Sequence, residues 1–331
     1  MKRILGIRLV VLGLFFSMLL AACGDPSPSA TSSATTTNSP TTVAATTVPV
    51  TTAPVITPSP TAPVSTTAAT TATPTAQDIA GLVDVGGFKL FISCTGVGSP
   101  TVILDTGAAD DSSVWSAVQS QVAQFTRVCR YDRGNLGKSE QATTPRTSQQ
   151  MVKELKTLLT NSQVKGPYLI VGHSLGGLNM QLYASQYPNE IAGVVLVESM
   201  HVDQFARFDK ALTKEQAAII NDFTGNPEKM TYENFKESVE QARTAAKFPP
   251  VPLIVLTRGW VGMVKPPESY WPTSLGDPFP ELENIWRELQ ADLVKLSPKG
   301  KQVIAEKSDH SIPLRQPELI TQSIQELIKQ G

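Results

Sequence analysis

Histidine and cysteine are both scarce in this sequence, with three of each among 331 residues. No cysteines and histidines fall at the spacing of a zinc site, so we expect no metal and no cofactor. The net charge is −1 and no basic block occurs outside the first residues, so we expect no nucleic-acid partner. Only three histidines are available as a catalytic base.

A long segment lacks charge altogether. Residues 26–77 hold no charged side chain and consist mainly of Thr, Ala, Ser, Pro and Val. They cannot bury an apolar face and should stay disordered, with the prolines favouring an extended spacer. We therefore expect a signal peptide at 1–22, a linker at 23–77 and one folded domain at 78–331, which is long enough for a substantial core.

The apolar run near the start is short for a transmembrane helix. Residues 9–20 follow three basic residues, whereas a spanning helix needs roughly 20 apolar residues. The run ends in Leu-Ala-Ala-Cys-Gly at 20–24 and resembles the lipobox of bacterial lipoproteins. The resemblance implies cleavage before Cys23, lipid on its sulfur, and anchoring to the outer face of the bacterial cell membrane. The alternative is ordinary secretion with an unmodified Cys23.

Apolar runs of strand length alternate with helix-period stretches in the folded part. This alternation predicts an α/β fold with a mostly parallel central sheet flanked by helices. The more polar, helix-like segment at about 200–249 predicts a small cap between the sixth and seventh strands. Strands are expected at 82–85, 88–94, 101–104, 127–131, 168–171, 191–197, 252–256 and 302–305, and helices at 113–125, 147–159, 178–187 and 317–329.

The motif Gly-His-Ser-Leu-Gly at 172–176 fits the nucleophile elbow G-x-S-x-G. A nucleophile on such a sharp turn needs glycines on both sides, because side chains there would collide. A strand is expected before the motif and a helix after it, as the elbow requires. Ser174 is therefore the candidate nucleophile, and the alternative is a glycine-rich turn without a catalytic role.

A serine hydroxyl needs an adjacent base, and the candidates are the three histidines. His173 lies on the elbow itself and should point away from the pocket. His201 lies in the expected cap, where a polar or substrate-contacting role is favoured. His310 follows the last strand and fits the order Ser–acid–His of the elbow-bearing hydrolases.

The segment Tyr-Asp-Arg-Gly at 131–134, with Gly137 and Ser139, is similar to a loop common in the α/β-hydrolase superfamily. Together with the elbow and the late histidine, it makes residues 78–331 resemble that superfamily. The resemblance implies a serine hydrolase, most simply of carboxylic esters, since the dehalogenases and epoxide hydrolases of the superfamily carry aspartate at the elbow. It assigns the loop at 131–139 a mostly structural role.

The acid of the triad is the departure from the family pattern. Most relatives carry it just after the strand expected at 252–256, but residues 257–265 contain no carboxylate. Other members place it at the end of the preceding strand, where this chain has Glu198. We therefore favour Glu198, with Asp203 and then Asp277 as alternatives, against the possibility that Glu198 is only a solvated strand end.

Two backbone N–H groups should form an oxyanion hole. One is expected from Leu175, the residue after the nucleophile. The resemblance implies that the other comes from the loop at 105–109, where Ala108 is the favoured donor and Ala109 the alternative.

The two remaining cysteines are expected to pair. The resemblance places the second and fourth strands side by side, which brings Cys94 close to Cys129, and an exported protein meets an oxidising compartment. The alternative is two free, buried cysteines that pack as small hydrophobic residues.

The expected reaction is ester hydrolysis through an acyl-enzyme, on a small, apolar substrate. Cleavage of amide, peptide, thioester or carbon–carbon bonds stays open, as does a non-catalytic binding protein, because fold alone does not decide. The aromatic residues of the insert at 260–280 either line an apolar pocket or anchor a loop: Trp260, Tyr270, Trp271 and Phe279.

Overall fold

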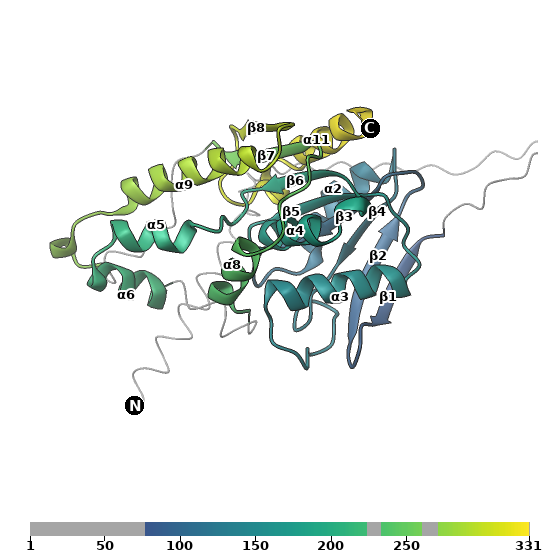
Figure 1. Ribbon diagram of the computed structural model, residues 1–331, viewed down its shortest axis with the longest axis horizontal. Coiled ribbons are helices and arrows are strands. Elements are labelled where there is room, and N and C mark those ends of the chain that lie inside the picture. Colours follow the sequence, from purple (N-terminus) through teal and green to yellow (C-terminus); the bar gives the residue numbers. More distant parts are fainter. Residues whose placement is uncertain (1–76, 224–232, 260–270, 331) are drawn as a thin grey trace, which may run out of the picture. The chain divides into compact units, whose positions relative to one another are not determined.

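The computed structural model describes residues 77–223, 233–259 and 271–330 (Figure 1). These contain a sheet in the order β1-β2-β4-β3-β5-β6-β7-β8. Strand β2 runs antiparallel to β1 and β4, and all other pairs are parallel. The predicted hairpin and mostly parallel sheet are therefore confirmed. The strands are β1 (Ile79–Asp84), β2 (Lys89–Thr95), β3 (Thr101–Asp105), β4 (Val128–Tyr131), β5 (Tyr168–His173), β6 (Ile191–Val197), β7 (Leu253–Arg258) and β8 (Gly300–Ala305).

The central strands are buried on both faces. All residues of β3, β5 and β7 are buried, which explains their continuous apolar runs, because helices cover both faces of a parallel sheet. Alternate residues enter different cores: Ile103 and Ile170 belong to one, while Val102 and Leu169 belong to the other. This two-sided burial holds the carboxyl ends of the parallel strands in fixed register.

Two groups of helices cover the sheet (Figure 1). Helices α3, α4 and α8 contact one another, and α2 and α10 pack with α11. Apolar residues of α3 and α4 lie in one core, and those of α2 and α11 lie in the other. The helices are α2 (Ser116–Val122), α3 (Ser148–Asn161), α4 (Leu175–Gln186), α5 (Gln204–Ala211), α6 (Lys214–Phe223), α8 (Phe235–Arg243), α9 (Phe279–Leu293), α10 (Ile312–Arg315) and α11 (Pro317–Gln330).

Several helix boundaries differ from the sequence-based expectation. A short 3-10 helix precedes α2, which ends at Val122. Helix α4 begins at Leu175, directly after Ser174, and not at Leu178. Thr147 caps α3, since its side chain accepts a hydrogen bond from the Gln150 N–H at 3.4 Å.

Helix α9 was not expected. Its buried apolar residues recur at three- and four-residue spacing, a helical signal present in the sequence. In Figure 1 the helix runs beside α5, and it carries side chains into the site described below. The buried apolar residues with this three- and four-residue spacing are Phe279, Leu282, Trp286, Leu289 and Leu293.

The described part of the insert between β6 and β7 contains α5, α6 and α8 and no strand beyond an isolated bridge from Glu233 to Arg146. This agrees with the expected helical cap at about 200–249. Within the described residues no helix is long and apolar enough to span a membrane. The expected signal peptide, Cys23 and nearly all of the linker lie outside them.

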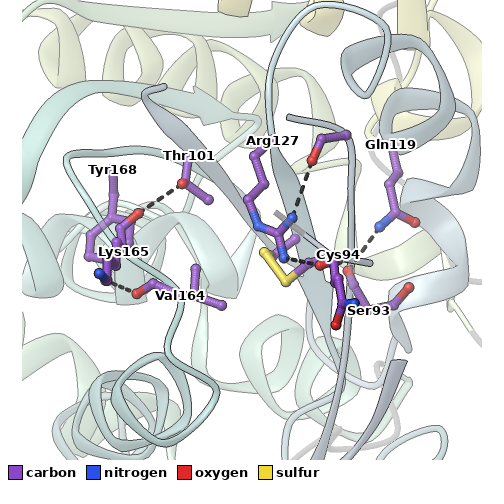
Figure 2. Close-up of a disulfide and its surroundings, with 11 residues drawn as sticks. Ser93, Cys94, Thr101, Gln119, Arg127, Val164, Lys165 and Tyr168 are labelled. Atoms are coloured by element: carbon purple, nitrogen blue, oxygen red, sulfur yellow. Dashed lines mark hydrogen bonds between the residues drawn. A yellow bond between two sulfur atoms is a disulfide. The ribbon is translucent and has the colours of Figure 1, made fainter. Parts of the chain in front are cut away.

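The expected disulfide joins Cys94 of β2 to Cys129 of β4 (Figure 2). The two residues face each other in the antiparallel register and both are buried. Nearby, the Gln119 side chain donates to the Ser93 carbonyl at 2.9 Å. The bond therefore cross-links the antiparallel strand β2 to β4, which pairs with the parallel strand β3.

Candidate active site

Ser174 lies at a sharp turn between β5 and α4. Its backbone angles are φ 52° and ψ −117°, a left-handed φ that side-chain-bearing residues rarely adopt. A Cβ on Gly172 would lie 2.7 Å from the Cα of Gly177, and one on Gly176 would lie 2.5 Å from the Thr106 carbonyl oxygen. The glycines of the motif therefore permit the strand, the helix and the loop after β3 to meet at the serine.

The elbow is tied to the end of the neighbouring strand β6. The Ser174 N–H donates to the Val197 carbonyl at 3.1 Å, and the Met200 N–H donates to the Ser174 carbonyl at 3.0 Å. The two residues between these contacts are Glu198 and Ser199. The candidate acid and the candidate nucleophile are thus held on adjacent strand ends by backbone hydrogen bonds.

The structure brings His310 and Glu198 together. Nδ1 of His310 lies 3.1 Å from Oε2 of Glu198, although 112 residues separate them in sequence. Glu198 is fully buried, whereas the His310 side chain is 44% exposed. A carboxylate only accepts hydrogen bonds, so this contact assigns the proton to Nδ1 and leaves Nε2 as the free base.

Arg258 and Trp286 complete the surroundings of Glu198. The Arg258 backbone N–H donates to Oε1 at 2.8 Å, and its guanidinium donates to Oε2 at 2.6 Å. The Trp286 indole N–H also donates to Oε2, at 3.0 Å. Burial acts to raise the pKa of Glu198, but the hydrogen bond and charge of His310, and the charge and backbone of Arg258, outweigh it and lower the pKa.

A second carboxylate balances the charge of Arg258. Its guanidinium also donates to Oε2 of Glu283 at 2.6 Å, and both side chains are buried. Arg258 stands at the end of β7, the strand after which most relatives carry their acid. The sequence showed that no carboxylate stands there, but it did not predict the role of the arginine. The role of Trp286 was not predicted because α9 was not expected.

His173 is buried behind His310. Its Nε2 lies 2.9 Å from the His310 carbonyl oxygen and the ring centroids are 4.7 Å apart. Burial, followed by the charge of His310, lowers the pKa of His173 to about 3. The ring is therefore neutral, donates from Nε2 and holds the backbone of His310.

The loop after β3 lies against the elbow. Among the described residues, neither the Ala108 N–H nor the Leu175 N–H has a hydrogen-bond partner. Gly107 has no room for a side chain, because a Cβ would lie 2.9 Å from Nδ1 of His173 and 3.0 Å from Oδ2 of Asp110. Burial raises the pKa of Asp110, despite the charges of Arg133 and His310. Sequence reasoning did not single out this carboxyl group.

Comparisons with known proteins agree with this architecture. A family model described as the alpha/beta hydrolase fold matches residues 100–261. The chain has the α/β-hydrolase fold. The uncharacterized protein YqjL of Bacillus subtilis is 26% identical over 233 residues, which are 66% of this chain and 80% of that protein.

Solved structures of hydrolases align over most of the chain. One is E-2-(acetamidomethylene)succinate hydrolase, with a TM-score of 0.53 and 16% identity over 76% of this chain and 100% of that one. Another is the CarC enzyme, a serine hydrolase involved in carbazole degradation, with a TM-score of 0.52 and 15% identity over 77% and 100%. At these identities the matches show the fold, and together with the family model they support a hydrolase.

The other acid candidates lie elsewhere in the fold. Asp203 pairs with Arg243 and lies beside His201 in the cap. Asp277 accepts a hydrogen bond from the Phe279 N–H at the start of α9. Of the acid candidates named from sequence, Glu198 is the one whose carboxylate contacts His310.

Two of the four aromatic residues of the insert pack on each other. The rings of Trp271 and Phe279 are 5.3 Å apart, and the Trp271 indole donates to the Gly276 carbonyl at 2.7 Å. These contacts agree with the anchoring alternative for this pair. Trp260 and Tyr270 lie outside the described residues. In the part of the chain that is described, no group of three or more Cys, His, Asp or Glu side chains could hold a metal ion.

Proposed function

We propose that the protein is a serine hydrolase with Ser174 as nucleophile, His310 as base and Glu198 as acid. The observation that carries the proposal is the hydrogen bond between Nδ1 of His310 and the fully buried carboxylate of Glu198. A carboxylate in that position fixes the tautomer and stabilises the imidazolium that forms during catalysis. The strained backbone of Ser174 on the neighbouring strand end supports its role as nucleophile.

In the proposed reaction, Nε2 of His310 removes the proton of the Ser174 hydroxyl as its oxygen attacks the substrate carbonyl. The resulting oxyanion accepts hydrogen bonds from the Leu175 and Ala108 N–H groups. His310 then protonates the leaving group, and water hydrolyses the acyl-enzyme by the same route. The unpartnered state of both N–H groups among the described residues supports this assignment.

Carboxylic esters are the proposed substrate class, and an apolar ester remains the expected substrate. Hydrolysis of an ester needs no catalytic groups beyond the triad and the oxyanion hole. The sequence also supports a lipid-anchored protein at the outer face of the cell membrane, with Cys23 as the lipid attachment site, and this localisation is part of the proposal.

The experiment compares wild-type protein with Ser174→Ala on a panel of p-nitrophenyl esters of rising acyl length. The wild type should hydrolyse at least one ester and be labelled by a fluorophosphonate probe, while the variant should lose labelling and at least about 10³-fold in kcat. Equal turnover by the variant would refute the mechanism. A folded wild type that neither hydrolyses esters nor takes the label would favour the non-catalytic binding protein.

A further inference from the structure

Arg133 lies in the loop after β4 that resembles the superfamily pattern. Its neighbours there have local roles, as expected: Asp132 accepts from the Ser112 N–H at 2.7 Å and the Lys138 N–H at 2.8 Å. Ser139 donates to the Asp132 carbonyl at 2.6 Å. Arg133 differs, because its side chain is fully buried and leaves the loop for the segment after β3.

The Arg133 guanidinium donates hydrogen bonds to the backbone of the loop at 105–109, which carries the proposed oxyanion donor Ala108. Nη1 donates to the Thr106 carbonyl at 2.8 Å, and Nη2 donates to the Gly107 carbonyl at 2.7 Å. Nη1 also pairs with Oδ1 of Asp105 at 2.7 Å. Two successive carbonyl groups of the loop therefore point toward one buried cation.

The hydrogen bond from Arg133 to the Gly107 carbonyl determines the direction of the Ala108 N–H. The Gly107 C=O and the Ala108 N–H belong to one planar trans peptide unit, so they point in opposite directions. A guanidinium that holds the carbonyl on one side must direct the N–H to the other side. The preceding peptide unit is also confined, because its Thr106 carbonyl oxygen would lie 2.5 Å from a Cβ on Gly176 of the elbow.

The second carboxylate that pairs with Arg133 comes from the cap. Nη2 of Arg133 lies 2.9 Å from Oε1 of Glu233, and both side chains are buried. Glu233 stands 100 residues away in sequence and lies just before α8. Its backbone pairs with Arg146, and the following Asn234 N–H donates to the Arg146 carbonyl at 2.8 Å.

We propose that Arg133 and Glu233 are positioning residues for the oxyanion hole. Arg133 orients the Ala108 N–H by donating a hydrogen bond to the Gly107 carbonyl. Glu233 holds the guanidinium in place through its ion pair. The orientation of the oxyanion donor therefore depends on a residue of the cap. This inference rests on the proposed function, because it assigns Ala108 as a donor to a developing oxyanion.

The test uses Glu233→Ala with a matched control, Glu154→Ala. Glu154 forms an equivalent buried ion pair with Arg146, at 2.7 Å and with the same side-chain exposures as the Glu233–Arg133 pair. It does not contact the loop at 105–109. Both variants lose one buried carboxylate beside an arginine. Arg133 keeps its ion pair with Asp105, whereas Arg146 has no second ion pair among the described residues, so Glu154→Ala should cost at least as much stability as Glu233→Ala.

Two readouts distinguish positioning from general destabilisation. Removing an oxyanion donor costs about 10²–10³ in kcat, and a misdirected donor should cost less, so Glu233→Ala should lower kcat by about 30-fold with KM changed by less than about twofold. The inhibition constant of a trifluoromethyl ketone, which forms a tetrahedral oxyanion with the serine, should rise by a similar factor. Glu154→Ala should change neither by more than about twofold.

A conservative variant keeps the test informative if Glu233→Ala folds poorly. Glu233→Gln retains an acceptor for Arg133 and should recover most of kcat and of inhibitor affinity. Equal losses in Glu233→Ala and Glu154→Ala, or unchanged ketone affinity in a folded Glu233→Ala, would overturn the inference. An inactive, unlabelled wild type would instead overturn the proposed function.

Discussion

Glu198 carries more hydrogen bonds than an acid that only orients a histidine needs. Its Oε2 receives His310, Arg258 and Trp286, and its Oε1 receives the Arg258 N–H. Its backbone also has a φ of 45°, a region that favours glycine. Strain of this kind persists where surrounding contacts over-determine a residue. The cluster therefore holds one carboxylate in one orientation against the cost of burying it.

Glu198→Gln should remove this function while keeping the shape of the side chain. The amide can present a donor to His310 and so favour the wrong tautomer, which in a serine triad costs about 10⁴ in kcat. We expect a loss of about 10³–10⁴-fold in kcat for ester hydrolysis, measured against active-site concentration. Asp203→Asn is the control for the rival acid and should change kcat by less than about twofold. A larger loss for Asp203→Asn than for Glu198→Gln would reverse the assignment.

His173 should make folding stability depend on pH. Its pKa is about 3 in the folded protein and about 6.5 when unfolded, so the unfolded chain binds the extra proton between these values. Stability is therefore lost as pH falls below about 6.5, at about 1.4 kcal/mol per pH unit for one proton.

The measurement is the free energy of urea unfolding at several pH values from 6.5 to 4.5, for wild type and His173→Gln. Glutamine can still donate to the His310 carbonyl but does not titrate. The wild type should lose stability more steeply than the variant by about 1.4 kcal/mol per pH unit. Burial also lowers the pKa of His201, but that contribution is common to both proteins and cancels. Parallel curves would contradict the prediction.

Among the secondary-structure elements, the strands could be predicted from the sequence, whereas the side-chain contacts between elements could not. Continuous apolar runs revealed β5, β6 and β7 because central parallel strands are buried on both faces. The elbow and the late histidine could be placed because each depends on its own local sequence. Arg258 and Trp286 could not, because their role arises only when β6, β7 and α9 converge on Glu198.

The disulfide between β2 and β4 should contribute stability without contributing to catalysis. It joins residues separated by 35 positions, and a bridge closing a loop of this length stabilises by about 3–4 kcal/mol in the chain-entropy account. The double variant Cys94→Ala/Cys129→Ala should lose about 3 kcal/mol in the free energy of urea unfolding. Its kcat at 25 °C should stay within about twofold of wild type, since neither cysteine contacts a candidate site residue. A fall in kcat larger than tenfold in the folded double variant would contradict this separation.

For the whole molecule, the sequence predicts a tethered enzyme. This prediction combines the lipobox at 20–24 with the charge-free segment of Thr, Ser, Ala and Pro that follows it in the sequence. If Cys23 carries the diacylglycerol that the lipobox implies, two or more acyl chains hold the protein on the membrane stably, whereas one chain would bind reversibly.

The variant Cys23→Ser tests the tether with the full chain. Expressed in a bacterial host, wild-type protein should partition into the detergent phase and incorporate radiolabelled palmitate. The variant should do neither and should appear in the aqueous phase. Because none of the proposed catalytic residues lies in residues 1–77, the specific ester hydrolase activity of both proteins in detergent solution should agree within about twofold. Equal partitioning of both proteins would remove Cys23 as the attachment site and leave ordinary secretion, or retention by the uncleaved apolar run, as the explanation. Unequal specific activity at equal folding would instead show that the tether acts on the enzyme and not only on its location.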